Sequence, residues 1–159
     1  MTEIRSAHTD ETDNLAKFYH DMWHESQAPF QDKRIADFRD LRFMRARINE
    51  FFPHIFVATN GNQIEGLMVA HNDRLSQLFI HPKTRGQGLG ANLLALGEAK
   101  MMAEGTVIAT LSCIKGNDGA RRFYERHDWT VFDEHSKMGE THQGWVAPVH
   151  IWEMRKTLK

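Results

Sequence analysis

Three glycines at alternate positions, Gly86, Gly88 and Gly90, lie between a short apolar run and an amphipathic segment. The apolar run at residues 78–80 is typical of a buried strand, and the apolar spacing over residues 88–104 predicts a helix. The first amides of a helix have no partner within it, and the helix dipole is positive at that end. Because glycine lacks a Cβ atom, a ligand can approach its backbone closely. This pattern predicts a binding site for a pyrophosphate group.

Two basic residues, Lys83 and Arg85, precede the glycines and are expected to add positive charge beside the anion. Glycines that only shape a turn are the structural alternative. A nucleoside triphosphatase loop does not fit, because it requires Gly-Lys followed by Ser or Thr. Gly86, Gly88 and Ala91 formally fit the dinucleotide fingerprint, but no acid follows in the place that motif requires, so a nucleotide-dependent oxidoreductase is disfavoured.

A second group of candidate residues follows the next predicted strand. Asn117 is suited to cap a helix with its side-chain oxygen, and Phe123 and Tyr124 lie further along that helix. A phenol has an unperturbed pKa of about 10 and can give a proton to a leaving group. Tyr124 is therefore a candidate general acid. The alternative is an amphipathic core side chain whose hydroxyl reaches water.

The glycine loop resembles the pyrophosphate loop of the GNAT superfamily of acetyltransferases. That loop has the pattern Arg or Gln, two residues, Gly, one residue, Gly or Ala, which Arg85, Gly88 and Gly90 match. Asn117, Ala120 and the run Phe123-Tyr124-Glu125 are similar to a second motif of the same family. The two motifs span residues 75–129. The flanking segments match the family in the order of their helices and strands, but not in sequence motif. One departure is His127-Asp128-Trp129, where the family commonly has Gly-Phe.

The resemblance implies an enzyme that binds acetyl-CoA and passes its acetyl group directly to a primary amine. It places the pantetheine arm along the strand before the loop, the pyrophosphate on the glycines, and the acid at Tyr124. It also implies that an amide of this strand stabilises the oxyanion and that Asn117 contacts pantetheine or orders its helix. The implied cofactor-binding residues are Leu78, Phe79, Ile80, Arg85, Gly86, Gln87, Gly88, Leu89, Gly90, Asn117 and Tyr124.

The acceptor is expected to be a small-molecule amine, with a peptide or protein amino group as the alternative. Family resemblance implies that residues 23–33 and 136–145 wall the acceptor cleft, and Trp23, Trp145 and Trp152 are candidates to line it or to complete the core. A non-catalytic acyl-CoA sensor is an alternative from another class, which Tyr124 disfavours. A homodimer through the final strands is common in the family and stays open.

No motif fixes a general base, although Glu65, His71 and Asp73 are candidates that could act through water. Each of them is also compatible with an ordinary solvated position. His20 and His24 share one predicted helix face, but no third ligand has diagnostic spacing, so no metal site is expected.

Composition narrows the class of protein further. With 20 basic and 21 acidic side chains in 159 residues, the net charge is −1, and no basic patch for nucleic acid is apparent. The apolar runs are too short to span a membrane, and a single cysteine, Cys113, fits a reducing compartment as a small buried hydrophobe. We expect a cytoplasmic protein with one domain over residues 1–159.

The elements needed to position these residues follow from periodicity and turn signals. Asn60-Gly61 and Asn72-Asp73 are predicted turns of a three-stranded meander. Strands are predicted near residues 4–7, 54–59, 64–70, 75–80, 107–114, 130–133 and 149–154, and helices near residues 11–25, 35–52, 88–104 and 118–127, with a polar connector over 136–144. The fold class is α/β (α+β), a mixed, mostly antiparallel sheet of about six to seven strands flanked by about four helices, in the order βααβββαβαββ.

Overall fold

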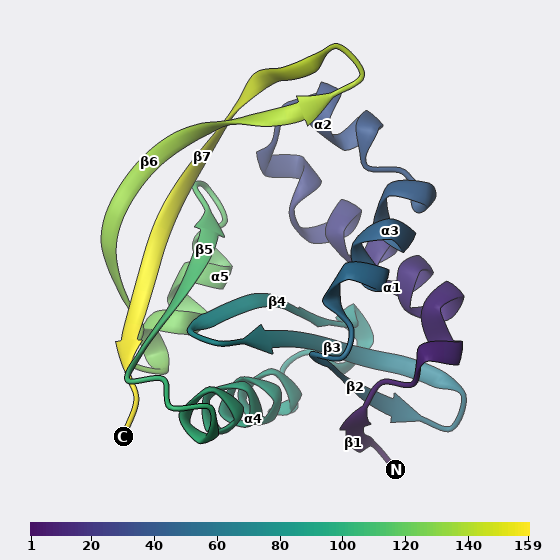
Figure 1. Ribbon diagram of the computed structural model, residues 1–159, viewed down its shortest axis with the longest axis vertical. Coiled ribbons are helices and arrows are strands. Elements are labelled where there is room, and N and C mark those ends of the chain that lie inside the picture. The colour runs from purple at the N-terminus through teal and green to yellow at the C-terminus, as the bar shows by residue number, and fades with distance from the viewer.

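Seven strands form one sheet in the spatial order β1-β2-β3-β4-β5-β7-β6, and helices cover both of its faces in the computed structural model of residues 1–159 (Figure 1). The strands are β1 (Glu3–Ser6), β2 (Ile55–Asn60), β3 (Gln63–His71), β4 (Arg74–Ile80), β5 (Ile108–Ile114), β6 (Thr130–Thr141) and β7 (Gly144–Thr157). The helices are α1 (Thr12–Ser26), α2 (Lys33–Phe38), α3 (Leu41–Phe51), α4 (Leu89–Ala103) and α5 (Asp118–Arg126), with short 3-10 turns at Thr9–Glu11, Ala28–Phe30 and Pro82–Thr84.

The predicted meander of β2, β3 and β4 is confirmed, with both of its turns where the sequence places them. Gly61 has a φ of +60° and Asn72 has a φ of +55°, a left-handed conformation that Gly and Asn adopt more easily than other residues. The strands pair antiparallel through Val57↔Leu67 and Leu67↔Phe79. This hairpin-linked unit carries β4, the strand that borders the candidate site.

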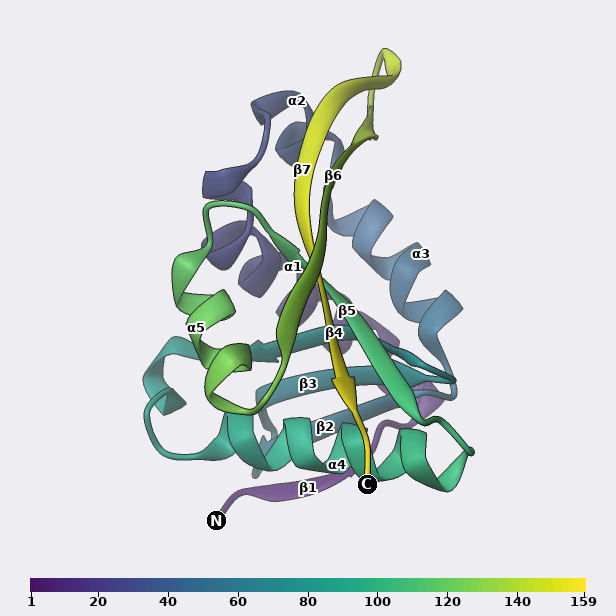
Figure 2. The same ribbon diagram turned by 90° about the vertical axis from the view of Figure 1, so that its left-hand side faces the viewer.

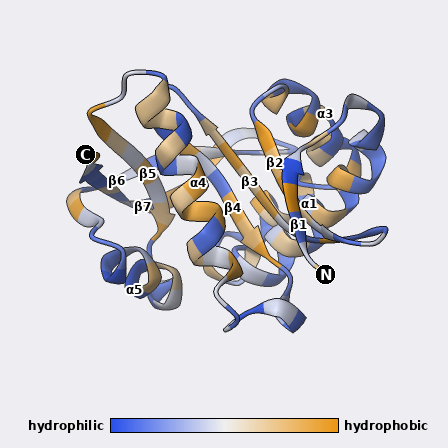
Figure 3. Cartoon of the chain, turned by 90° about the horizontal axis from the view of Figure 1, so that it is seen from below, coloured by the Kyte–Doolittle hydropathy of each residue, from blue (hydrophilic) through white to orange (hydrophobic).

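Two hydrophobic clusters fill the two sides of the sheet. On one side α1, α2 and α3 pack on the sheet around Leu15, Tyr19 and Met44. On the other side α4 packs on β3 and β4 through Leu93, and Trp129 lies in the same cluster. Seen from below in Figure 3, hydrophobic colour follows the strands, whereas α5 is largely hydrophilic and contains no buried residue. None of the helices is both long and apolar enough to cross a membrane.

The sheet divides between its two central strands. β4 and β5 run parallel, yet they share only one register pair, Arg74↔Thr110, while every other neighbouring pair of strands is antiparallel and paired over four or more positions. Figure 2 shows β4 and β5 turning away from one another beyond this point. On the edge that faces β5, the backbone of β4 therefore has no neighbouring strand along its outer half.

Two predictions about the elements are wrong in detail. The single helix expected over residues 35–52 is two helices, because Asp40 caps a new one by accepting a hydrogen bond from the Phe43 amide at 2.9 Å. The polar connector expected over residues 136–144 is instead the turn end of a long β6–β7 hairpin, made of the second half of β6, the turn and the first residue of β7. β6 is an edge strand exposed over most of its length, so it lacks the alternation of apolar and polar residues that identifies a half-buried strand.

The departure from the family at the end of α5 has a local structural solution. Asp128 has a φ of +71°, the left-handed cap position that Gly usually takes, and the next residue, Trp129, is fully buried. The Trp129 amide donates to the Tyr124 carbonyl at 3.1 Å, which ties the turn to the helix. The chain thus keeps the turn, but the backbone of Asp128 is strained because this residue has a Cβ atom.

Asp128→Gly should raise the free energy of unfolding by about 0.5–1 kcal/mol, because a left-handed backbone disfavours a residue with a Cβ atom. Urea denaturation of both proteins would measure the difference. Asp133→Gly is the matched control, since Asp133 lies in β6 without a positive φ and should lose stability. Equal losses in both variants would contradict this account of the turn.

Candidate active site

The division between β4 and β5 opens into a cleft of about 780 Å³. The structure brings nine of the eleven predicted site residues to its walls: Leu78, Phe79, Ile80, Arg85, Gly86, Gly88, Gly90, Asn117 and Tyr124. Of the other two, Gln87 is exposed and donates weakly to the Lys83 carbonyl, and Leu89 packs into the hydrophobic cluster beside α4. Residues from both predicted motifs therefore face one another across a single cavity.

The backbone of β4 presents alternate residues to this cleft. The His81 amide donates to the Glu65 carbonyl at 2.8 Å, and the register pairs Phe79 with Leu67. Because hydrogen-bonded residues alternate along an antiparallel strand, Phe79 bonds to β3, and the N–H and C=O groups of Leu78 and Ile80 point toward the cleft. The Ile80 carbonyl accepts from Arg85 Nε at 3.1 Å. The Leu78 amide, the Leu78 carbonyl and the Ile80 amide are left for a ligand.

The glycine loop adds a second set of free donors. Gly86 and Gly88 have φ values of +79° and +84°, and the Asn92 amide makes the first bond of α4 by donating to the Gly88 carbonyl at 3.0 Å. The amides between Gly86 and Ala91 therefore have no backbone acceptor within the protein. They surround the positive end of a 15-residue helix, an arrangement that suits a phosphate group.

Arg85, which lines the cleft, is engaged in an ion pair within the chain. Its guanidinium forms a bidentate pair with Glu25 at the end of α1, with contacts of 2.9 and 2.8 Å. Hydrogen bonds from Arg85 hold the pKa of Glu25 below its ordinary value, so the carboxylate is ionised at neutral pH. The expectation that Arg85 adds positive charge beside an anion stays a prediction, and in this structure that charge is paired with Glu25. Arg85 thereby joins α1, the end of β4 and the loop.

Asn117 connects the two sides of the cleft. Its Oδ1 accepts from the Ala120 amide at 3.2 Å and caps α5, and its Nδ2 donates to the Ser26 carbonyl at the end of α1 at 3.4 Å. The predicted capping role is therefore present in the structure. Phe123 and Tyr124 of α5 are half-buried against the cluster that contains Trp129, so this packing, the cap and the turn after Asp128 together place Tyr124.

Tyr124 and Cys113 lie together on the wall of the cleft. Burial raises the pKa of the Tyr124 phenol well above its ordinary value, and the nearby Cys113 adds to this effect. Burial also raises the pKa of the Cys113 thiol to about 11. At neutral pH both groups are protonated, so Tyr124 can donate a proton, whereas Cys113 is a poor nucleophile.

A polar cluster lies where β4 and β5 begin to separate. Arg74 on β4 donates to Glu153 on β7 at 2.9 Å, and Ser112 on β5 is hydrogen-bonded to both side chains. Burial acts to raise the pKa of Glu153, but the hydrogen bonds from Arg74 and Ser112 outweigh it and lower the pKa overall. The cluster holds three strands together where the division of the sheet begins.

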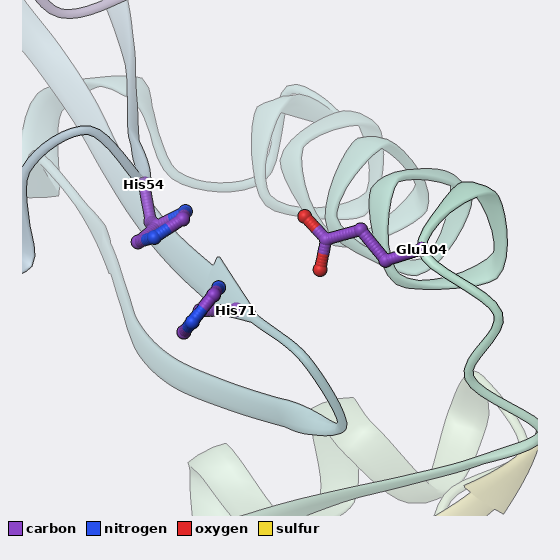
Figure 4. Close-up of side chains that lie close together, drawn as sticks. All are labelled: His54, His71 and Glu104. Carbon is purple, nitrogen blue, oxygen red and sulfur yellow. The ribbon is translucent and has the colours of Figure 1, made fainter.

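None of the three candidate bases, Glu65, His71 and Asp73, lines the cleft. His71 instead stacks on His54 with ring centres 3.7 Å apart, next to Glu104 (Figure 4). The His54, His71 and Glu104 ligand atoms lie within 4.8 Å of one another, but the Lys100 ammonium lies 3.3 Å from His54 Nδ1 and 2.5 Å from Glu104. Lys100 thus supplies the positive charge that a metal would bring.

The histidines that share one face of α1 are also engaged elsewhere. His24 Nε2 donates to the Arg39 carbonyl at 2.7 Å, and His20 Nδ1 lies 3.0 Å from Asp21. Their rings pack with centres 4.4 Å apart. One ring nitrogen of each histidine is thus engaged within the chain.

Comparison with known families gives the same assignment as the geometry. A family model described as an acetyltransferase (GNAT) domain matches residues 10–142. The chain belongs to the GNAT family. It is therefore an acetyl-CoA-dependent acetyltransferase, as the resemblance of its two motifs implied. No curated protein sequence gives a significant match.

Solved structures share the GNAT fold over nearly the whole chain. The yncA protein of Salmonella typhimurium, solved with its cofactor acetyl-CoA, is 15% identical with a TM-score of 0.74, over 100% of this chain and 95% of that one. An N-acetyltransferase from Staphylococcus aureus Mu50 is 13% identical with a TM-score of 0.75, over 100% and 99%. The PaiA N-acetyltransferase of Thermoplasma acidophilum, in complex with coenzyme A, is 16% identical with a TM-score of 0.68, over 99% of each chain. The predicted fold class is confirmed.

Sequence reasoning missed several residues of the cleft. Ser112 and His127 line it although neither was a candidate, and Glu25 lines it from within residues 23–33, which were expected only to wall the acceptor cleft. Glu25 reaches it from α1, 60 positions away from its partner Arg85, and Ser112 does so from the far side of the division. Only His127, which directly follows α5, carried a local signal, since it departs from the family pattern.

Asn117→Ala should lower the free energy of unfolding by about 0.5–2 kcal/mol, because it removes the α5 cap. Asn117→Asp keeps a capping oxygen but loses the donor to Ser26, so it should be closer to wild type in stability. Thermal unfolding measured by circular dichroism would separate the two. A larger loss for the aspartate variant would show that the bond to Ser26, not the cap, holds α5.

Proposed function

We propose that this GNAT enzyme binds acetyl-CoA in the cleft between β4 and β5 and transfers the acetyl group to the primary amine of a small molecule. The observation that carries the proposal is the convergence of three features on one cavity. These are the open backbone edge of Leu78 and Ile80, the free amides from Gly86 to Ala91, and the Tyr124 phenol. Each suits a different part of an acyl-CoA molecule.

The pantetheine arm contains amide groups that can pair with a strand edge. The free N–H and C=O groups of Leu78 and the N–H of Ile80 offer such an edge, so the cofactor would replace the missing strand contact. The pyrophosphate would lie on the loop amides at the start of α4. Because Arg85 is paired with Glu25, neutral donors supply most of this recognition, with the exposed Lys83 nearby.

In the transfer step the neutral amine nitrogen attacks the thioester carbonyl carbon, and an amide of Leu78 or Ile80 donates to the oxygen as it becomes negative. The carbon–sulfur bond then breaks, and the Tyr124 phenol gives its proton to the thiolate of coenzyme A. The acceptor ammonium loses one proton to solvent before the attack, and the nitrogen loses a second as the amide forms, which restores the Tyr124 phenol through water. Burial favours the neutral phenol, and it makes the leaving thiolate more basic for the same reason.

The segments expected to wall the acceptor cleft, residues 23–33 and 136–145, support a small-molecule acceptor rather than a polypeptide. α2 packs directly against β6, and a Cβ atom at Gly139 would lie 2.6 Å from the Ile35 side chain. The long β6–β7 hairpin thus closes over the helices, as Figure 1 shows. Trp23 is buried beneath this contact, whereas Trp145 is 65% exposed near the hairpin turn. Such a partly covered approach has little room for an extended chain.

Acetyl-CoA at about 100 times its Kd should raise Tm by about 5 to 11 °C, because a ligand that binds only the folded state stabilises it by about 2.7 kcal/mol. Gly88→Asp should abolish the shift, since it adds a side chain at a φ of +84° and a negative charge beside the phosphates. NADH serves as the control ligand and should have no effect. The absence of any shift at millimolar acetyl-CoA would overturn the proposed cofactor site.

Tyr124→Phe should lower kcat by about 10²–10⁴-fold while the acetyl-CoA-dependent shift in Tm persists, because it removes the acid and leaves the cleft intact. Cys113→Ala is the matched control. It alters the neighbouring group, which is protonated at neutral pH, and should retain most of the activity. Release of coenzyme A, detected with a thiol reagent, measures both. If wild type binds acetyl-CoA but acetylates no amine, the chain acts as a sensor instead.

A further inference from the structure

The Tyr19 hydroxyl is a polar group in the hydrophobic core with no hydrogen-bond partner. Tyr19 is fully buried on α1, between the rings of Phe51 and Phe79, whose centres lie 5.9 and 5.7 Å away. A buried donor that lacks an acceptor destabilises the folded state, and Phe would fill the same space without this cost. The hydroxyl therefore calls for a partner that the chain itself does not supply.

Arg39 also lacks a hydrogen-bond acceptor for its guanidinium, and its positive charge acts on the Tyr19 phenol. It occupies the break between α2 and α3, and its guanidinium lies over the rings of Trp23 and Phe43 at 4.8 and 5.1 Å. Burial lowers the pKa of this guanidinium from its ordinary value. The His24 side chain fixes the Arg39 backbone by donating to its carbonyl at 2.7 Å. A half-buried cation is thus held in place with no carboxylate beside it.

Arg47 completes the group from one turn further along α3. Its guanidinium lies 5.9 Å from the Phe43 ring and 5.2 Å from the Phe51 ring. Burial raises the pKa of Tyr19, whereas the positive charges of Arg47 and Arg39 act to lower it, so both cations lie within electrostatic range of the phenol. Arg45 of the same helix pairs with Asp13 at 2.5 Å, but neither Arg39 nor Arg47 forms an ion pair.

Two carboxylates act electrostatically on this group, but neither forms an ion pair with it. Glu50 acts on Tyr19, and Glu140 of β6 acts on Arg39, yet both do so only at a distance. Long arginine side chains often cover aromatic rings for packing alone. Packing does not explain, however, why two like charges are held together next to an unpaired hydroxyl, because each of these features costs free energy unless an anion is present.

The group lies on the face of the sheet that α1 to α3 cover, and Phe79 connects it with the cleft. Phe79 is on β4, and its backbone pairs with β3, so the strand positions on either side of it are the ones that face the proposed thioester. Tyr19 contacts Phe79 from the face covered by α1 to α3, opposite the face that carries α4. An acceptor amine that approaches the thioester from this side would have its remaining atoms near Tyr19, Arg39 and Arg47.

We infer that Tyr19, Arg39 and Arg47 bind an oxyanion, a carboxylate or phosphate group, carried by the amine acceptor. Two guanidinium groups and a phenol together donate to such a group in the way that arginine clusters commonly do. The aromatic walls from Trp23, Phe43 and Phe51 suit an apolar portion beside the acid. The role as an acceptor site rests on the proposed function, whereas binding of the anion does not.

Binding of the anion can be tested without catalysis. Phenylacetate at ten times its Kd should raise Tm by about 3 to 6 °C, and the isosteric but neutral phenylacetamide should not, at matched ionic strength. Inorganic phosphate as a second probe shows whether the site prefers a carboxylate or a phosphate. Equal effects of phenylacetate and phenylacetamide, or no effect of either anion, would overturn the inference.

Variants decide whether these residues form the site. Arg39→Gln should abolish the shift, whereas Arg42→Gln, an exposed position on α3, should leave it unchanged. Tyr19→Phe should raise the Tm of the free protein by about 2 to 4 °C yet weaken the response to the anion. A purely structural role for Tyr19 would give the first effect without the second.

The acceptor role is tested by comparing L-phenylalanine with phenethylamine, and O-phosphoethanolamine with ethanolamine, as substrates. An acidic amine should have a kcat/KM at least about tenfold above that of its neutral counterpart, and Arg39→Gln should lower kcat/KM for the acidic amine more than for the neutral one and so remove this preference. If anion binding persists but no amine is acetylated, the proposed function fails and the anion site stands. If neutral and acidic amines are equally good substrates, the acceptor role fails alone.

Discussion

The structure depends on an interruption in the middle of its sheet. Two parallel strands, β4 and β5, share a single register pair and then separate, so the outer half of β4 has main-chain donors and acceptors without a neighbouring strand. Such groups are normally paired inside a protein, and they remain accessible here only because the gap is a cleft. The helices on the two faces and the Arg74, Ser112 and Glu153 cluster keep the gap open in a fixed shape.

The glycine loop and β4 offer the cleft neutral backbone donors. The one arginine of the glycine loop is paired with Glu25, and the amides at the start of α4 are left as donors for an anion. Tyr124 and Cys113 are both kept protonated by burial. The opposite arrangement holds on the other side of β4, where Arg39 and Arg47 carry charge that nothing in the chain neutralises. The two sides of the strand thus differ in their electrostatic character.

Most of the fold could be predicted from local sequence signals, and the failures have physical causes. Asn60-Gly61 and the glycines before α4 specify backbone conformations directly, which is why the meander and the loop are where they were expected. Asp40 as a cap was overlooked because the apolar spacing continues across it. The β6–β7 hairpin was largely missed because an exposed edge strand has no buried face to create a pattern.

Within the site, the two motifs were enough to predict residues that line a common cleft. What they could not predict were partners distant in sequence. The pairing of Glu25 with Arg85 follows from how α1 crosses the sheet, and no local pattern records it. The unpaired Tyr19 hydroxyl is even less accessible to sequence reasoning, since a tyrosine at an apolar helix position is expected to complete the core.

The interruption of the sheet also has a mechanical consequence. It divides the molecule into two blocks, one with β1 to β4 and the other with β5 to β7, which are joined by few main-chain bonds. Near the Arg74 cluster they are held tightly, and the contact between Ile35 and Gly139 restrains them at the far end. Relative motion of the blocks should therefore be a small twist about these two anchors rather than a wide opening. A cofactor that contacts both blocks would reduce the amplitude of this twisting motion. Amide hydrogen exchange along the free edge of β4 would slow as a result.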